Sequence, residues 1–256
     1  MTTDYASNGS LYLYANKRFN LYTETLAGLA PPDDFSYPAA VAKLWREEVL
    51  FIFSGLVRAV EFMHSKGVCH LGLDVHTIVI DSSGNPIIVD FGSSEVAEAD
   101  GFVGRGRSIL CKPHYRAPEV HNHNHNPKGS PGVNGRAADM YSLGLYWLLF
   151  IYPPRGNIII DPVTQHGQWR HHLFQHLEQD FADHDEDTCV FQFHDPLDRN
   201  IAQILEGLLQ TQPESRTKAC ELRENIEGYN YQIQDDTRTR CQALVEEFLS
   251  IAADES

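Results

Sequence analysis

The stretch His70-Leu-Gly-Leu-Asp-Val-His-Thr77-Ile-Val-Ile80, which continues as Asp81-Ser-Ser-Gly-Asn-Pro-Ile-Ile-Val-Asp90-Phe91-Gly92, decides the fold of this chain. Two short β-rich runs, residues 78–80 and 87–89, flank six residues that are rich in turn-forming types. The pattern predicts a β-hairpin, with residues 70–77 before it and the Asp-Phe-Gly loop after it.

The same stretch resembles the catalytic loop and the metal loop of eukaryotic protein kinases, whose patterns read H-R-D-L-K-P-x-N and D-F-G. His70, Phe91 and Gly92 keep the family residues, and the resemblance places His70 and Phe91 in the core against a central helix. The family's activation-loop-sensing Arg, catalytic base, phosphate-facing Lys and metal-binding Asn are replaced, in that order, by Leu71, Gly72, Asp74 and Thr77. The resemblance implies a kinase-like frame that does not transfer phosphate.

Three further landmarks of the kinase large lobe follow in the family order. Tyr115-Arg-Ala117-Pro118-Glu119 matches the A-P-E element that closes the activation segment. The run from Asp139 to Gly144 resembles the start of the family's central buried helix, whose Asp holds the backbone of the catalytic loop. Arg216 falls where the family places the Arg that pairs with the A-P-E Glu, so we expect a buried Glu119–Arg216 ion pair.

The resemblance does not extend to the kinase small lobe. Five strands and a helix of mean length need roughly 40 residues, but only ten residues precede Leu11, and the chain has no G-x-G-x-x-G. Residues 11–26 show strand-like alternation and resemble the last small-lobe strand and the hinge. We therefore expect a mainly α fold, a kinase C-lobe-like helical domain with one short hairpin and little or no N-terminal β lobe.

The domain organisation follows from these landmarks. Residues 1–10 are small and polar and predict a flexible lead-in, residues 11–219 predict the kinase-like large lobe, and residues 220–256 predict a C-terminal helical extension. Apolar residues three and four apart predict a helix over residues 43–64, and further helices are expected over residues 140–150, 201–209 and 243–251. An uncovered hairpin would leave apolar surface, so we expect chain segments 11–26 and 243–251 or a protein partner to cover it.

Composition limits the classes of partner. The formal net charge is −15, which argues against nucleic acid and anionic membranes and favours a protein partner with a basic surface, or self-association. Five scattered cysteines without C-x-x-C spacing predict free thiols in a reducing compartment. No apolar run approaches the roughly 18 residues of a membrane span. We expect a soluble, intracellular protein of the cytoplasm, with the nucleus left open.

Few residues offer metal or cofactor chemistry. Asp90 is the remaining acid of the metal loop and Val79 is, by resemblance, the floor of the nucleotide site, so both are weak remnants at most. The run His121-Asn-His-Asn-His125 and the pair His172 and His176 suggest metal binding, but no Cys or carboxylate accompanies them at fixed spacing. We expect a solvated surface loop at 121–125 and a solvated acidic face at 180–187, and we leave metal binding by the histidine loop open.

The favoured hypothesis is a pseudokinase that acts as a binding, scaffold or regulatory module and is not an enzyme, with no cofactor. The alternative is a divergent or partner-completed protein kinase with weak phosphotransfer from ATP and Mg2+. Asp74 as a displaced base is disfavoured, because a shift of two residues in a tight loop points the carboxylate elsewhere. Phosphorylation of Ser108 would lack the Arg that Leu71 replaces. A third hypothesis is a truncated paralogue with little function of its own.

Overall fold

The computed structural model describes residues 6–29, 33, 35, 37–151, 196–226 and 237–254. It is mainly helical, with small sheets. The elements, in chain order, are α1 (Leu11–Gly28), α2 (Tyr37–Ser65), β1 (Val68–Cys69), β2 (Ile78–Ile80), β3 (Pro86–Ile88), β4 (Glu95–Val96), β5 (Phe102–Val103), α3 (Pro118–His125), β6 (Val133–Asn134), α4 (Gly135–Ile151), α6 (Pro196–Leu208), α7 (Ala219–Ile226) and α8 (Thr237–Asp254), with single 3-10 turns at Phe91–Ser93, Pro113–Tyr115 and Pro213–Ser215.

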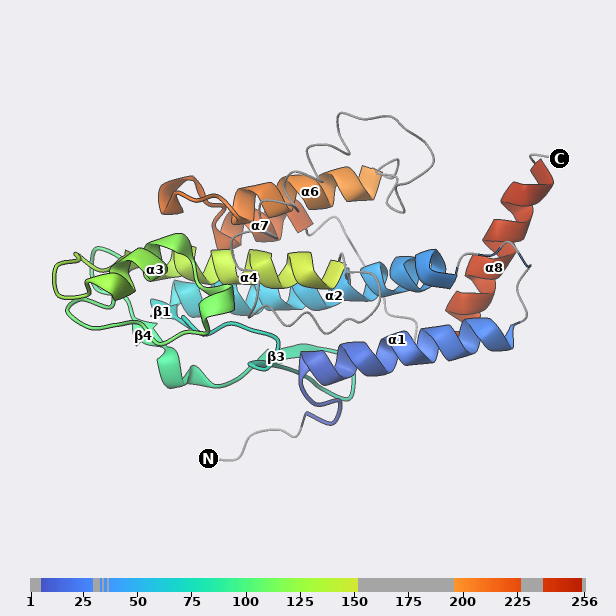
Figure 1. Ribbon diagram of the computed structural model, residues 1–256, viewed down its shortest axis with the longest axis horizontal. Helices are drawn as coiled ribbons and strands as arrows, with labels where there is room; N and C mark the ends of the chain where they lie inside the picture. The colour runs from blue at the N-terminus through green and yellow to red at the C-terminus, as the bar shows by residue number, and fades with distance from the viewer. Residues whose placement is uncertain are drawn as a thin grey trace.

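Helix α2 is the centre of the molecule. The apolar residues that predict it recur at spacings of three and four and are buried; they are Val49, Ile52, Phe53, Leu56, Val57, Val60 and Met63. It packs against α4 and α7 on one side and α1 on the other, while α8 crosses α1 near one end of the molecule (Figure 1). One helix with a wide apolar face therefore organises the core.

Helices α4 and α6 approach each other closely at Gly144. A Cβ atom placed on Gly144 would lie 2.7 Å from the Cβ of Leu208, a distance that real Cβ contacts essentially never show. The glycine that resembles the family's central helix therefore has a packing role here. Any larger residue would push α6 away from α4.

Three two-stranded antiparallel sheets lie among the described residues: β1 with β4, β2 with β3, and β5 with β6. The predicted hairpin is the β2–β3 pair, with Ile78 opposite Ile88 and Val79 opposite Ile87. Its turn is closed by Asp81, whose carboxylate accepts the backbone N–H groups of Ser83 and Asn85, each at 2.8 Å. The catalytic-like loop before β2 and the Asp-Phe-Gly loop after β3 both lie at the open end of the hairpin, opposite its turn, where the N–H of Val89 donates to the carbonyl of Thr77 at 2.8 Å.

The expectation of a strand at residues 11–26 is wrong, because this segment is helix α1. Its buried residues are spaced for one helical face, namely Leu11, Tyr14, Ala15, Tyr22 and Leu26. Ser10 caps the helix by accepting the backbone N–H of Leu13 at 3.4 Å. Leucine and tyrosine alternate over the first four residues, as in a strand, but over the whole segment the buried residues recur with the helical period of about 3.6 residues.

Part of the expected lead-in is ordered against the hairpin. The backbone N–H of Asn8 donates to the carbonyl of Ile80 at 3.2 Å, the N–H of Ile80 donates to the carbonyl of Gly9 at 2.9 Å, and Ser10 bridges Val79. Residues 1–5 lie outside the described residues. The segment that precedes α1 thus covers the outer edge of β2, and α1 itself contacts β2.

The four predicted helices lie within α2, α4, α6 and α8, except that the helix predicted over residues 201–209 extends one residue beyond the end of α6 at Leu208. The predicted surface loop at 121–125 is wrong, because these residues form the last turns of α3. His172, His176 and the acidic residues 180–187 lie outside the described residues. Within the described ranges, no helix is long and apolar enough to cross a membrane.

Candidate functional site: a catalytic-like loop without its acid

The buried Asp139 of α4 holds the backbone of the loop that begins at His70. Its carboxylate accepts the N–H of His70 at 2.8 Å and the N–H of Leu71 at 2.7 Å, and it also lies 3.0 Å from Nε2 of His64. Leu71 has a φ of 63°, a left-handed conformation that costs free energy in a residue other than glycine. Two backbone N–H groups that donate to one carboxylate offset that cost and fix the start of the loop.

By resemblance to the family pattern, Gly72 falls at the position of the base, and it carries no side-chain functional group. Its backbone N–H donates to Nδ1 of His70 at 3.3 Å. A Cβ atom placed on Gly72 would meet Ser93 at 3.5 Å and His70 at 3.7 Å, which are ordinary contacts. The position therefore has room for a Cβ atom, and glycine supplies no acid there.

The carboxylate of Asp74 is engaged inside the loop. One oxygen accepts the N–H groups of His76 at 2.6 Å and Thr77 at 3.2 Å, and the other lies 2.5 Å from the ammonium of Lys112. The residue is only 2% exposed. Burial, followed by repulsion from Asp74, raises the pKa of Tyr115. Asp74 thus ties the catalytic-like loop to the segment before the A-P-E element.

Thr77, which by resemblance falls at the position of the metal-binding Asn, closes the same loop. Its hydroxyl accepts the N–H of Asp74 at 2.9 Å and lies 3.1 Å from the carbonyl oxygens of both Gly72 and Asp74. The hydroxyl therefore accepts one backbone N–H of the loop and donates its proton to the carbonyl oxygens of the same loop. Thr77 and Asp74 together brace the loop from inside.

The Asp-Phe-Gly loop is more open. Asp90 is exposed and left-handed, with φ 63° and ψ 69°, and its carboxylate accepts the N–H of Gly92 at 3.3 Å. The ring of Phe91 packs edge-on against His70 at 5.0 Å, yet Phe91 is 50% exposed. The expectation that both residues belong to the core is correct for His70 and wrong for Phe91, which has no covering element over half its surface.

The expected Glu119–Arg216 ion pair is present and bidentate. Nη1 of Arg216 lies 2.7 Å from one carboxylate oxygen of Glu119 and Nη2 lies 3.1 Å from the other. Arg216 also donates to the carbonyl oxygens of Ala137 and Gln210. Its side chain is fully buried, and that of Glu119 is 14% exposed. Ala117 is the N-cap of α3 and Pro118 is its first residue, so Glu119 lies in the first turn of the helix, where it pairs with Arg216.

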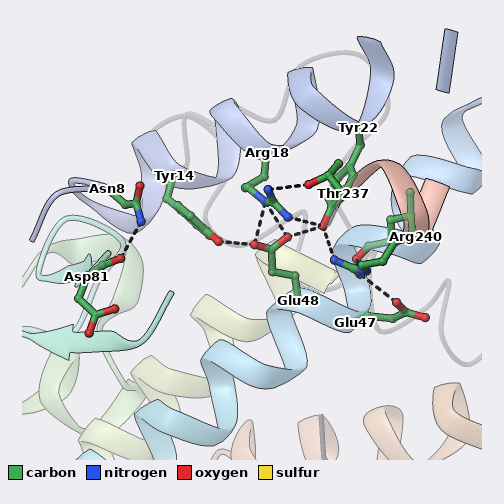
Figure 2. Close-up of polar contacts among 10 residues, drawn as sticks. Asn8, Tyr14, Arg18, Tyr22, Glu47, Glu48, Asp81, Thr237 and Arg240 are labelled. Carbon is green, nitrogen blue, oxygen red and sulfur yellow. Dashed lines mark hydrogen bonds and ion pairs between the residues drawn. The ribbon is translucent and has the colours of Figure 1, made fainter. Parts of the chain in front are cut away.

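A second polar cluster, which the sequence did not reveal, joins α1, α2 and α8 around Glu48 (Figure 2). The fully buried Glu48 accepts hydrogen bonds from the hydroxyls of Tyr14 and Tyr22 and from the guanidinium of Arg18. Burial, followed by the charge of Glu48, raises the pKa of both tyrosines. Arg240 of α8 donates to Tyr22 at 2.7 Å. The spacing of Tyr14, Arg18 and Tyr22 by four residues was a helical signal for this cluster.

The structure brings His70, Leu71 and Asp139 together and pairs Glu119 with Arg216, while Val79 lies half-buried on the hairpin beside Ser10. Asp90 shares no metal-binding cluster, because the described part of the chain contains no group of three or more His, Cys, Asp or Glu residues that could hold a metal ion. The four cysteines in that part, Cys69, Cys111, Cys220 and Cys241, are free thiols.

A hairpin flanked by a His-led loop and an Asp-Phe-Gly loop, with an A-P-E helix tied to a buried Arg, defines a protein of the kinase class. The protein kinase domain family matches residues 9–225 of this sequence. The chain therefore belongs to the protein kinase family.

Curated relatives share part of the chain. CBL-interacting protein kinase 24 of Oryza sativa subsp. japonica is 37% identical over 122 residues, which cover 47% of this chain and 25% of the relative. CBL-interacting serine/threonine-protein kinase 15 of Arabidopsis thaliana is 37% identical over 117 residues, covering 45% and 26%. A probable CHK1 homolog of Encephalitozoon cuniculi is 36% identical over 101 residues, covering 40% and 22%. The matched regions span about a quarter of the length of these relatives.

Proposed function

We propose that this chain is a pseudokinase: a kinase large lobe whose catalytic loop has become a structural loop and which acts as a binding, scaffold or regulatory module. The environment of Asp74 carries the proposal. The acid nearest in sequence to the base position is buried, and both of its oxygens are used by the loop backbone and Lys112. A general base must lie within hydrogen-bond reach of the proton that it removes, and this carboxylate is committed elsewhere.

The effects of the substitutions at positions 72, 74 and 77 on phosphoryl transfer reinforce one another. Phosphoryl transfer depends on positioning and electrostatic stabilisation, and here Gly72 supplies no base, Thr77 supplies no amide oxygen and position 74 is an acid instead of a cation. Asp90 alone is a poor Mg2+ site, because Mg2+ is usually held by one or two carboxylates together with substrate phosphates. We therefore infer that the protein uses no cofactor.

The face around the hairpin is the candidate binding surface. The segment before α1 and α1 itself cover β2, while Leu13 of α1 and Phe91 of the Asp-Phe-Gly loop remain about half exposed. With a net charge of −15, a protein partner with a basic surface is the better electrostatic match. Cytoplasmic action on such a partner is part of this proposal.

A second candidate function is supported by Asp90. Its carboxylate is exposed and accepts one backbone N–H among the described contacts, so it retains oxygen lone pairs for a metal ion. A second chain that supplied phosphate-binding groups would make a partner-completed kinase. The curated relatives are named as kinases, which agrees with this alternative.

Incubation of the purified chain with radiolabelled ATP and Mg2+, with and without a generic substrate, tests the proposal. We expect no incorporation by the natural sequence. A protein with Gly72→Asp should also be inactive, although the position has room for a Cβ atom, because groups that act as a unit fail together. Incorporation that disappears in Asp90→Ala would overturn the pseudokinase proposal in favour of the kinase alternative.

A further inference from the structure

Helix α3 separates the three histidines that the sequence placed in one loop. Residues four apart lie on the same face of a helix, whereas residues two apart do not. His121 and His125 are exposed, and His123 is buried. The ring of His123 lies 2.7 Å from the hydroxyl of Ser130 and 2.8 Å from the carbonyl of Arg107. His123 is therefore a structural residue, and the other two form a surface pair.

The imidazoles of His121 and His125 converge through the same ring nitrogen. Their Nε2 atoms are 3.0 Å apart, and the rings meet edge to face with centroids 4.6 Å apart. With neutral rings, one Nε2–H can donate to the lone pair of the other. When each neutral ring carries its proton on Nδ1 instead, both Nε2 atoms offer a lone pair, and their 3.0 Å separation lets one metal ion contact both.

The separation of the two nitrogens selects a coordination angle. For metal–nitrogen bonds of about 2.0 to 2.1 Å, a tetrahedral angle places two ligands about 3.3 to 3.4 Å apart, and a right angle places them about 2.8 to 3.0 Å apart. The observed 3.0 Å fits the right angle. Square-planar or tetragonal nitrogen sites suit Cu2+ and Ni2+, and Cu2+ binds most tightly among the divalent ions of this series.

We propose that His121 and His125 form a two-imidazole site for a tetragonal divalent transition-metal ion, Cu2+ or Ni2+. Water completes the coordination, because both side chains face solvent and no group of three or more metal-ligating residues occurs among the residues described. Mg2+ and Ca2+ are not expected here, since both prefer oxygen ligands. The site is separate from Asp90 and does not depend on the proposed function.

Metal binding at this pair would act on the segment that contains Ser108. Asn124 of α3 exchanges two hydrogen bonds of 2.8 Å with the backbone of Ile109, and His123 contacts the carbonyl of Arg107. A helix of eight residues is marginal on its own, and a metal ion bridging positions 121 and 125 would cross-link its last two turns. The ion would therefore stabilise α3 and the segment of residues 107–109 bound to its other face.

The test is Cu2+ binding to the full chain, purified without a polyhistidine tag, by isothermal titration calorimetry. Because the chain has 13 histidines, the site is measured as a difference between variants. His121→Gln and His125→Gln should each remove one Cu2+ equivalent or weaken it by on the order of 10²-fold, since either change leaves a single donor in place of a chelating pair. His76→Gln, at an exposed histidine outside α3, and Asn122→Gln, beside the pair, should bind as the natural sequence does.

Hydrogen exchange gives a second readout that does not depend on the count of ions. Saturating Ni2+ should slow exchange across α3 and residues 107–109 in the natural chain and in His76→Gln, and should leave it unchanged in His121→Gln. Equal Cu2+ binding by the natural chain and both pair variants would overturn the proposal. Loss of binding in only one pair variant would do so too, because it would show that the two rings do not share an ion.

Discussion

Replacing Glu119 by Gln should destabilise the protein strongly, because the change removes the charge that faces a buried guanidinium. The side chain of Arg216 is fully buried, with 0% of it exposed, and the side chain of Glu119 is 14% exposed. Breaking a buried ion pair costs about 3 to 5 kcal/mol. Arg216 keeps the carbonyl oxygens of Ala137 and Gln210, so the lower end, about 3 kcal/mol, is expected. For a chain of this size, that corresponds to a fall in Tm of roughly 6 to 12 °C.

Thermal unfolding followed by circular dichroism measures this change, with Glu221→Gln as the matched control. Glu221 also pairs with a cation, Lys218, at 3.5 Å, but their side chains are 51% and 74% exposed. An exposed pair contributes about 0 to 1 kcal/mol, so the control should melt within about 2 °C of the natural sequence. If Glu119→Gln melts with the control, the Glu119–Arg216 pair does not anchor α3 and the reasoning is refuted.

Three further predictions address the catalytic-like loop, the Glu48 cluster and alkaline pH. Millimolar ATP with Mg2+ should not raise the Tm of the natural chain, and a rise that Asp90→Asn abolishes would contradict the pseudokinase proposal. Glu48→Gln should speed hydrogen exchange in α8 and α1, because Arg18 loses its buried carboxylate, whereas Glu246→Gln on the exposed face of α8 should not; equal exchange in both variants would refute the role of the cluster. Burial, followed by the charge of Asp139, raises the pKa of Cys69 to about 12. The folded state therefore keeps a thiol proton that the unfolded chain releases at lower pH. The contribution of this proton to the free energy of unfolding is fully present below about pH 8.5 and is lost as the pH rises through about 12. The urea midpoint should fall between pH 8 and 11 less steeply in Cys69→Ala than in the natural chain, and parallel curves would show that the thiol is not the cause.

Local sequence patterns were sufficient to predict the elements that depend on the spacing of apolar residues and on turn-forming residues. The three-and-four spacing of apolar residues gave helix α2, and the turn residues between two β-rich runs gave the β2–β3 hairpin. The resemblance to protein kinases identified Glu119 and Arg216 as partners across 97 positions. It also predicts that Gly72 stands at the position of the family's base, and this prediction depends only on the order of residues.

Residues 11–26 show where local pattern was ambiguous. Four alternating apolar residues at the start favoured a strand, but the segment is helix α1, because its buried face follows a helical spacing and packs on α2. The histidine run was ambiguous in the same way: only the helical backbone of α3 decides that His121 and His125 meet and that His123 turns inward.

The sequence by itself determined that the chain belongs to the protein kinase family, because the family pattern follows from the order and identity of residues. Only the tertiary structure decided what the remaining polar groups do. The orientation of a carboxylate depends on which donors the folded chain brings within about 3 Å of it. Lys112 reaches Asp74 from 38 positions away, and Tyr14 reaches Glu48 from another helix. A local pattern cannot encode such contacts, since they form only when distant elements pack together.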